Sequence, residues 1–446
     1  MSSGKFEKME KDFSSEVDAL LAQIEQSIKA GQITEALEAL LSMEKQTRSA
    51  ADLASTTRIL VHAVIVCYTA KDWKRLNETV VLLSKKHGQL KQAVTKMVQQ
   101  AMEYLDCTPD QETMLALLDT LRTVTEGKIY LEVERAHLTR RLSKVKEDEG
   151  KISEAADILQ ELQVETFGSM EKREKTEFIL EQMRLCLLNK DYIRTLIISR
   201  KINPSFFKIP ENEDLKLRFY NLMVDHALHE NEYLNICKYY REIYSTKAVE
   251  SDETDRKTVL EKILIFIILA PYDHEQSDLL HRIMEDKHLS SCELYHQLAK
   301  TFTQHEIMRW PMIETHYGPQ LVNTDIFKTG TQDGLKRWEA LHSRVIEHNI
   351  RVIAKYYTRI TISRLTELLD LSSESTEEFL SNLVVSKTVF ARIDRPSGVV
   401  SFVPPRDSPT VLTEWTHDVN KLLGLIEQTT HLIAKEEMVH KIAQAM

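Results

Sequence analysis

The stretch RITISRLTELLDLSSESTEEFLSNLVVSKTVFARIDRPSGVVSF, residues 359–402, has the order of elements of a winged helix. After Thr361, a suitable N-cap, the apolar residues Ile362, Leu365, Leu368 and Leu369 recur at helical spacing. The serine-rich segment 372–386 predicts a second helix with acidic residues in its first turn, where the helix dipole favours them. Two apolar runs around RPSG then predict a β-hairpin.

The second predicted helix is acidic where a DNA-binding winged helix is basic. Its first turn carries Glu374, Glu377 and Glu378, and no Lys or Arg follows until Lys387. Binding to a duplex depends on several Lys or Arg contacts to phosphate, so this surface would repel DNA. We therefore expect no nucleic-acid partner. We expect instead that the short edge strands pair with strands of another chain.

The chain before the winged helix repeats at a step of about forty residues. Each copy has a polar turn, then an Ile or an aromatic residue, then an amphipathic helix. The marker residues are Ile33, Trp73, Ile152, Tyr192, Tyr233 and Tyr272. The interval from Trp73 to Ile152 holds two steps, with the missing copy near residues 109–124. Such a period predicts an α-solenoid of paired helices, the alternative being a helical domain whose repeats arise by chance.

Composition supports a mainly helical chain. Only 11 Gly and 10 Pro occur in 446 residues, and the net charge of −10 gives no reason to expect a polyanionic partner. The five cysteines are scattered without a CxxC pair, which is typical of buried thiols in a reducing compartment. The longest apolar run, residues 263–270, is too short to span a membrane. The N-terminus lacks the apolar core of a signal peptide, so we expect the cytoplasm and nucleus and no membrane partner.

The C-terminal segment 412–446 has an apolar surface too wide for one neighbour. Seven residues alternate in steps of three and four, as in a heptad seam: Leu412, Trp415, Val419, Leu422, Ile426, Thr429 and Ile433. Four more widen this surface: Leu423, Leu425, Leu432 and Met438. We predict that this helix enters a bundle with helices of other chains. The alternative is that it packs on its own domain.

No catalytic motif is present: there is no HExxH, GxSxG, P-loop or GxGxxG. Asp225, His226, His229 and Glu230 share one helix turn, but a zinc site would need a further ligand, and a solvated helix face is the simpler interpretation. The basic stretches 85–96 and 135–146 fit either a docking site for an acidic protein or RNA, or ordinary solvated helix faces. We therefore expect no enzyme activity, no cofactor and no metal.

A helical-repeat array followed by a winged helix and a long last helix resembles the PCI-domain proteins. Several stretches are similar to the p55 family of non-ATPase lid subunits of the 26S proteasome regulatory particle. They include LLSMEKQTR, LLSKKHGQLKQAVTKMVQQ, LRTVTEGKIYLEVERA, EFILEQMRLCL, EHNIRVIAKYYTRIT and THLIAKEEM. The similarity runs from about Leu41 to Met438. It is weakest at the extreme N-terminus, at the polar segment 245–257, which predicts a loop within the solenoid, and at the linker 322–334. The paralogous subunit of the COP9 signalosome, with the same scaffold role, is the alternative.

The resemblance implies a fold and a role. The fold is a right-handed α-solenoid of TPR-like helical pairs over residues 21–321, after a flexible extension at 1–20. A linker or loop at 322–334 precedes the winged-helix part of a PCI domain at 335–405 and a bundle helix at 410–446. The role is that of a non-catalytic scaffold whose winged helix and last helix join other PCI subunits of the lid.

The resemblance also implies partners and contact residues. The partners are the other lid PCI subunits, the lid deubiquitinating subunit, the ATPase base and the core particle. The hairpin contact would involve Val389, Phe390, Val400 and Phe402, and the bundle contact Leu412, Trp415, Val419, Leu422, Ile426 and Ile433.

Overall fold

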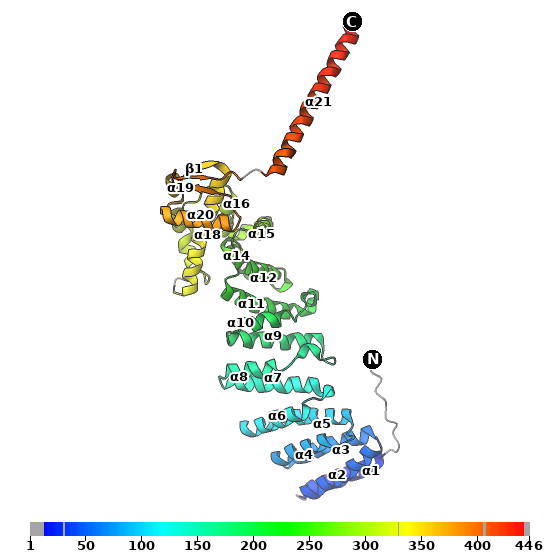
Figure 1. Ribbon diagram of the computed structural model, residues 1–446. Coiled ribbons are helices and arrows are strands. Elements are labelled where there is room, and N and C mark those ends of the chain that lie inside the picture. Colours follow the sequence, from blue (N-terminus) through cyan, green and yellow to red (C-terminus); the bar gives the residue numbers. More distant parts are fainter. Residues whose placement is uncertain (1–12, 30–31, 329, 405–406, 441–446) are drawn as a thin grey trace. The chain divides into compact units, whose positions relative to one another are not determined.

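The computed structural model describes residues 13–29, 32–328, 330–404 and 407–440. The chain forms two compact units. Unit 1 is Met1–Asn231 with Tyr239–Asp252, and unit 2 is Glu232–Lys238 with Glu253–Met446. Figure 1 shows that unit 1 consists of helices stacked one pair after another.

Unit 1 contains the helical repeats. Its helices are α1 (Ser14–Lys29), α2 (Ile33–Ser49), α3 (Leu53–Thr69), α4 (Trp73–Lys85), α5 (Lys91–Glu103), α6 (Gln111–Thr125), α7 (Glu132–Asp148), α8 (Ile152–Gln160), α9 (Lys172–Leu188), α10 (Tyr192–Ser199), α11 (Glu213–Glu230) and α13 (Lys247–Ser251); α12 (Tyr233–Tyr244) belongs to both units. Short 3-10 helices connect them: η1 (Tyr104–Cys107), η2 (Ile129–Leu131), η3 (Val164–Thr166), η4 (Pro204–Lys208) and η5 (Pro210–Asn212).

The predicted period is confirmed in the helix starts. α2, α4, α8, α10 and α12 begin at the predicted marker residues, and α6 occupies the place of the missing copy. The last marker differs slightly, because α15 begins at His274, two residues after Tyr272. A shared turn explains the regular starts. Lys71 and Lys190 adopt left-handed backbone conformations, and the following Asp72 and Asp191 each accept a 3.1 Å hydrogen bond from the backbone N–H three residues on.

Buried apolar side chains hold neighbouring repeats together. α3 packs on α5, α4 on α6 and α9 on α11, so each helix pair packs on the next one along the chain. Leu60, Leu76, Met97 and Leu118 are fully buried in this shared core. The first repeats, through α7, therefore share one continuous core.

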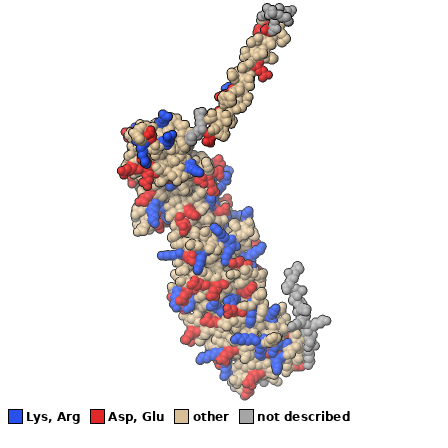
Figure 2. Space-filling view, viewed as in Figure 1, with Lys and Arg blue, Asp and Glu red and all other residues tan. Residues whose placement is uncertain are grey.

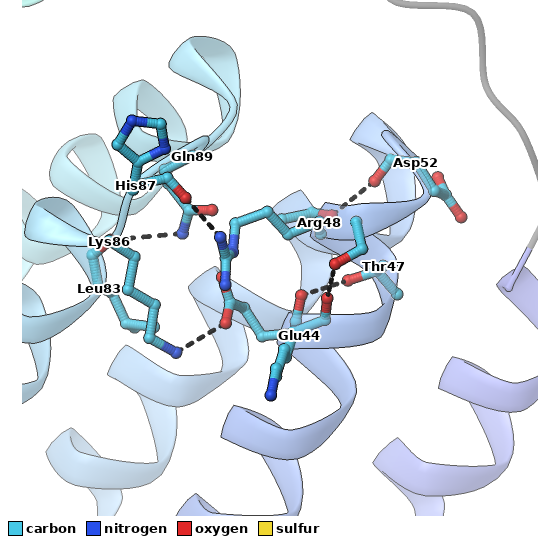
Figure 3. Close-up of polar contacts among 11 residues, drawn as sticks. Glu44, Thr47, Arg48, Asp52, Leu83, Lys86, His87 and Gln89 are labelled. Atoms are coloured by element: carbon cyan, nitrogen blue, oxygen red, sulfur yellow. Dashed lines mark hydrogen bonds and ion pairs between the residues drawn. The ribbon is translucent and has the colours of Figure 1, made fainter.

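A buried ion pair network joins the first two repeats (Figure 3). The Glu44 side chain on α2 has no exposed surface, and its two oxygens accept from Arg48 Nε at 2.9 Å and from Lys86 Nζ at 2.7 Å. Arg48 also donates to the carbonyl oxygen of His87. Because Lys86 and His87 follow α4, the carboxylate of one repeat fixes the end of the helix in the next.

Unit 2 contains the last helical elements and the winged helix. Its elements are α14 (Glu253–Leu269), α15 (His274–Met284), η6 (Lys287–Cys292), α16 (Glu293–Thr303), α17 (Trp310–Val322), α18 (Gln332–Tyr356), β1 (Arg359–Thr361), α19 (Ile362–Leu369), α20 (Ser373–Val385), β2 (Arg392–Asp394), β3 (Val399–Ser401) and α21 (Ser408–His440). α18 anchors the segment before α17, because Asn349 exchanges two hydrogen bonds with the backbone of Met308 (2.8 and 2.7 Å).

The winged helix forms as predicted, with one additional strand. α18, α19 and α20 bury Ile350, Leu365 and Leu380 against the sheet. The sheet has the order β1-β3-β2, and β3 pairs antiparallel with both neighbours; Val400 lies opposite Ile360 and Ile393. We did not predict β1. Its three residues lie directly between two helices and are too few to show an alternating pattern.

Two segments differ from the loop and the extension that we expected, and a third, between the end of α17 and the start of α18, is a loop as expected but is packed onto the domain. The segment 245–257 is largely helical: α13 is followed by α14, whose first turns are polar and exposed and whose later residues, from Leu260 on, are buried. The flexible extension does not reach residue 20, because α1 begins at Ser14 and Val17 is fully buried; residues 1–12 lie outside the described part. In the segment 322–334, Phe327 is buried and its ring meets Trp338 edge-on at 5.8 Å.

Candidate interaction surfaces

The structure corrects the predicted hairpin contact. Val389, Val400 and Phe402 are buried in the core of the winged helix together with α18, α19 and α20, and only Phe390, with 42% of its surface exposed, is open to a partner. The reason is that β3 is the central strand and one of its faces packs on the helices. Three of the four side chains therefore stabilise the domain itself and are not available to contact another chain.

The outer edges of the sheet belong to β1 and β2. The backbone of β3 is paired on both sides, so a strand from another chain has only these two edges to pair with. β2 carries the exposed Arg392 and Asp394 beside the partly exposed Ile393. From the sequence we predicted that an edge strand pairs with another chain, but the contact residues that we proposed lie on or beside the central strand. The order of short strands in a sheet cannot be read from the sequence.

The acidic start of α20 is exposed in the structure. Ser372 caps the helix by accepting a hydrogen bond from the backbone N–H of Ser375 at 3.2 Å, and Glu374 lies in the first turn. Glu377 pairs with Arg395 of the hairpin turn, whereas Glu374 and Glu378 are open to solvent. This surface is negative in the place where groove-binding helices carry basic residues.

The C-terminal helix α21 is exposed along its whole length. None of its described residues is buried, and the six predicted bundle residues expose between 36% (Val419) and 66% (Trp415) of their surface. Figure 2 shows this helix covered mostly by uncharged side chains, whereas Lys or Arg and Asp or Glu side chains mix over the repeats. An apolar surface of this length on one helix is typical of a helix that another chain covers.

The cluster on α11 makes contacts within the chain, and its His226 is buried and not solvated. His226 makes a 3.1 Å hydrogen bond with the backbone carbonyl oxygen of Tyr192. The ring of His229 stacks on the ring of Tyr192, with 3.6 Å between the ring centroids. Burial raises the pKa of Asp225. In the described ranges, no three His, Cys, Asp or Glu side chains converge as metal ligands.

The second basic stretch is largely neutralised within the chain. Arg141 pairs with Asp106, and His137 lies 2.9 Å from Glu174. Arg140 lies over the ring of Phe178. Across the helices that the structure describes, none is both long enough and apolar enough to cross a membrane.

A buried histidine lies beside the winged helix. His348 on α18 is 3% exposed, and its Nε2 lies 3.2 Å from the carbonyl oxygen of Glu306. Burial, and secondly the charge of Arg351, lower the pKa of His348 to about 4. Arg351 itself lies over the ring of Tyr272 at 3.6 Å. These groups line a cavity of about 400 Å³ that also contacts Phe390 and Phe402.

Models of known protein families match three successive segments of the chain. Residues 35–252 match the family model PSMD12/CSN4, N-terminal, residues 300–403 match the PCI domain, and residues 410–441 match the C-terminal domain of the 26S proteasome regulatory subunit RPN5. The chain is 46% identical over 435 residues to the 26S proteasome regulatory subunit RPN5 of Saccharomyces cerevisiae, covering 97% of both chains. The chain belongs to the RPN5 family.

Other members of the RPN5 family match at similar levels. The 26S proteasome non-ATPase regulatory subunit 12 of Dictyostelium discoideum is 44% identical, over 99% of this chain and 98% of its own. Subunit 4 of the COP9 signalosome complex of Drosophila melanogaster is only 25% identical, over 74% of this chain and 78% of its own. The RPN5 assignment is therefore favoured over the signalosome subunit. These relatives in the RPN5 family are named as regulatory subunits of the 26S proteasome.

Proposed function

We propose that this chain is a non-catalytic structural subunit of the 26S proteasome lid that supports ubiquitin-dependent protein degradation. Its winged helix and its C-terminal helix join it to other PCI subunits of the lid. Through its repeats it contacts the lid deubiquitinating subunit, the ATPase base and the core particle. It acts in the cytoplasm and nucleus, which fluorescence imaging of the tagged chain would test.

The observation that carries this proposal is α21. Its apolar residues alternate in steps of three and four over the length of the helix, and none of the described ones is buried. Leaving such a surface in water is unfavourable, since each fully buried Leu or Ile contributes about 1.5–3 kcal/mol. The same residues belong to the segment that matches the RPN5 C-terminal domain. Together these facts favour a helix that becomes buried on assembly.

The sheet edges support a second contact. β1 and β2 present backbone groups at the two margins of the winged helix, and Phe390 is exposed nearby in sequence. Strand addition at such an edge uses main-chain hydrogen bonds and needs few side-chain contacts. We propose β2 as the pairing edge, because Arg392 and Asp394 on it are both exposed and offer opposite charges to a neighbouring strand.

The experiment is an affinity purification of the tagged full-length chain from its own cells, followed by mass spectrometry. We expect proteasome lid, base and core subunits with the full-length chain, and their loss when the chain is truncated after Pro409. Recovery of signalosome subunits would assign the chain to that complex instead. Recovery of the chain alone at monomer size would refute the scaffold role.

A further inference from the structure

The repeat helix α10 differs from its counterparts on the side that faces solvent. Ile193 and Ile197 expose 77% and 56% of their surface, and Leu196 between them exposes 36%. The three lie at spacings i, i+3 and i+4 and form one apolar stripe along the helix. Thr195 and Ile198 are buried and hold α10 on the repeat, so the stripe is not what packs the helix.

Three of the other repeats provide an internal control. α2, α4, α8 and α10 each begin at the marker residue of their repeat, so their second and sixth residues occupy equivalent positions. These positions are exposed in all four helices. They are Thr34 and Glu38 in α2, Lys74 and Glu78 in α4, Ser153 and Asp157 in α8, and Ile193 and Ile197 in α10. The fold therefore accepts polar residues at both positions, and the two isoleucines of α10 do not serve folding.

The charges around the stripe indicate the chemistry of its partner. Lys190 before α10 and Arg200 after it are both exposed, and in the described structure neither has a carboxylate within ion-pair distance. Arg194 pairs with Asp191 at 3.2 Å. Residues 188–201 hold four basic residues and one acidic residue, in a chain whose net charge is −10. An apolar stripe with an unpaired cation at each end is complementary to an apolar surface flanked by acids.

We propose that the exposed face of α10 (Ile193, Leu196, Ile197) is the docking site for a helix of a partner protein that carries apolar residues flanked by Asp or Glu. A stripe one helix wide fits a second helix packed against it. Lys190 and Arg200 pair with the flanking acids and fix the direction of the partner. The inference rests on the proposed function, because the partner is a subunit of the same assembly.

Thiol labelling of the intact assembly tests this inference. Ile197→Cys is introduced into a chain in which the exposed native Cys107 is replaced by Ser, and Glu38→Cys at the equivalent position of α2 is the control. In the free chain both thiols react with a maleimide at similar rates. In the purified assembly we expect Cys at 197 to react at least about tenfold more slowly, as burial at an interface protects it. Equal reactivity at 197 in the assembly and in the free chain would overturn the docking site and leave the scaffold role standing.

Two double variants test the chemistry. Ile193→Thr with Ile197→Glu gives α10 the residues of α2, so the fold is retained, and we expect binding of the partner to weaken at least about tenfold. Lys190→Glu with Arg200→Glu should also weaken binding of the partner, and the loss should be larger at low salt than at high salt. If Ile193→Thr and the pair Lys190→Glu with Arg200→Glu, each placed in the Ile197→Cys chain, leave protection at 197 unchanged, the proposed chemistry is wrong. Protection that comes from a second copy of this chain, seen as a dimer of the isolated protein, would also overturn it. Failure to recover any assembly would overturn both this inference and the proposed function.

Discussion

The double substitution Leu422→Glu and Ile426→Glu in α21 should abolish assembly while leaving the chain folded. Leu422 and Ile426 expose 57% and 52% of their surface, so the isolated chain loses little when either changes. Surface substitutions usually alter the free energy of unfolding by no more than about 0.5 kcal/mol. Glu is also a good helix former, so α21 itself is retained.

In the assembly the same substitutions carry a large penalty. About half of each side chain remains to be covered, and full burial of Leu or Ile is worth about 1.5–3 kcal/mol, so each lost contact costs about 1 kcal/mol. Each carboxylate placed in an apolar seam costs at least another 1 kcal/mol or so, even when it takes up a proton. The sum of about 4 kcal/mol corresponds to roughly a thousandfold weaker association.

The assay compares this variant with a matched control. Asn420→Glu with Gln428→Glu adds the same charge to the polar side of α21. Thermal unfolding of each purified chain should match the parent, and affinity purification should recover lid subunits with the control but not with the Leu422 and Ile426 variant. Normal assembly of that variant would refute the argument that partners bury this face. Equal loss with the control would show that charge, and not apolar contact, decides assembly.

Three further predictions concern the fold. Lys86→Met should lower the free energy of unfolding by about 2 kcal/mol, because the buried carboxylate of Glu44 then keeps only Arg48 as an ion-pair partner. Urea unfolding measures this change. A loss below about 0.5 kcal/mol would contradict a stabilising role of the network. Phe402→Ala should destabilise the winged helix by about 3–5 kcal/mol, because Phe402 is buried, whereas Phe390→Ala should leave the stability nearly unchanged. Urea unfolding of the two variants measures the difference. A larger loss with Phe390→Ala would mean that Phe402, and not Phe390, is available to contact another chain. The free energy of unfolding should fall as the pH is lowered from about 6.5 towards 4, because His348 has a pKa of about 4 in the folded chain and the unfolded chain takes up the proton first. The variant His348→Gln should flatten this part of the pH profile. An unchanged profile would show that His348 does not cause the loss of stability.

The sequence predicted those features that depend on short-range order. The starts of α2, α4, α8 and α10 follow from a marker residue and the turn before it, and in α4 and α10 an Asp in that turn caps the helix within three residues. The apolar stripe of α21 also follows from local periodicity. The prediction of an assembly role rests on the same periodicity, since an apolar surface too wide for one neighbouring helix is visible in the sequence.

Tertiary structure decided which apolar residues are buried and which are exposed. Val400 and Phe402 resemble contact residues in the sequence, but the order β1-β3-β2 places β3 in the middle of the sheet and turns them into core residues. The polar start of α14 resembles a loop until the buried residues that follow hold it in a helix. Ile193 and Ile197 of α10 are exposed, although isoleucine is usually a core residue. In the winged helix the deciding contacts join residues far apart in the chain, such as Ile360 and Val400, and their pairing is set by packing and not by local preference.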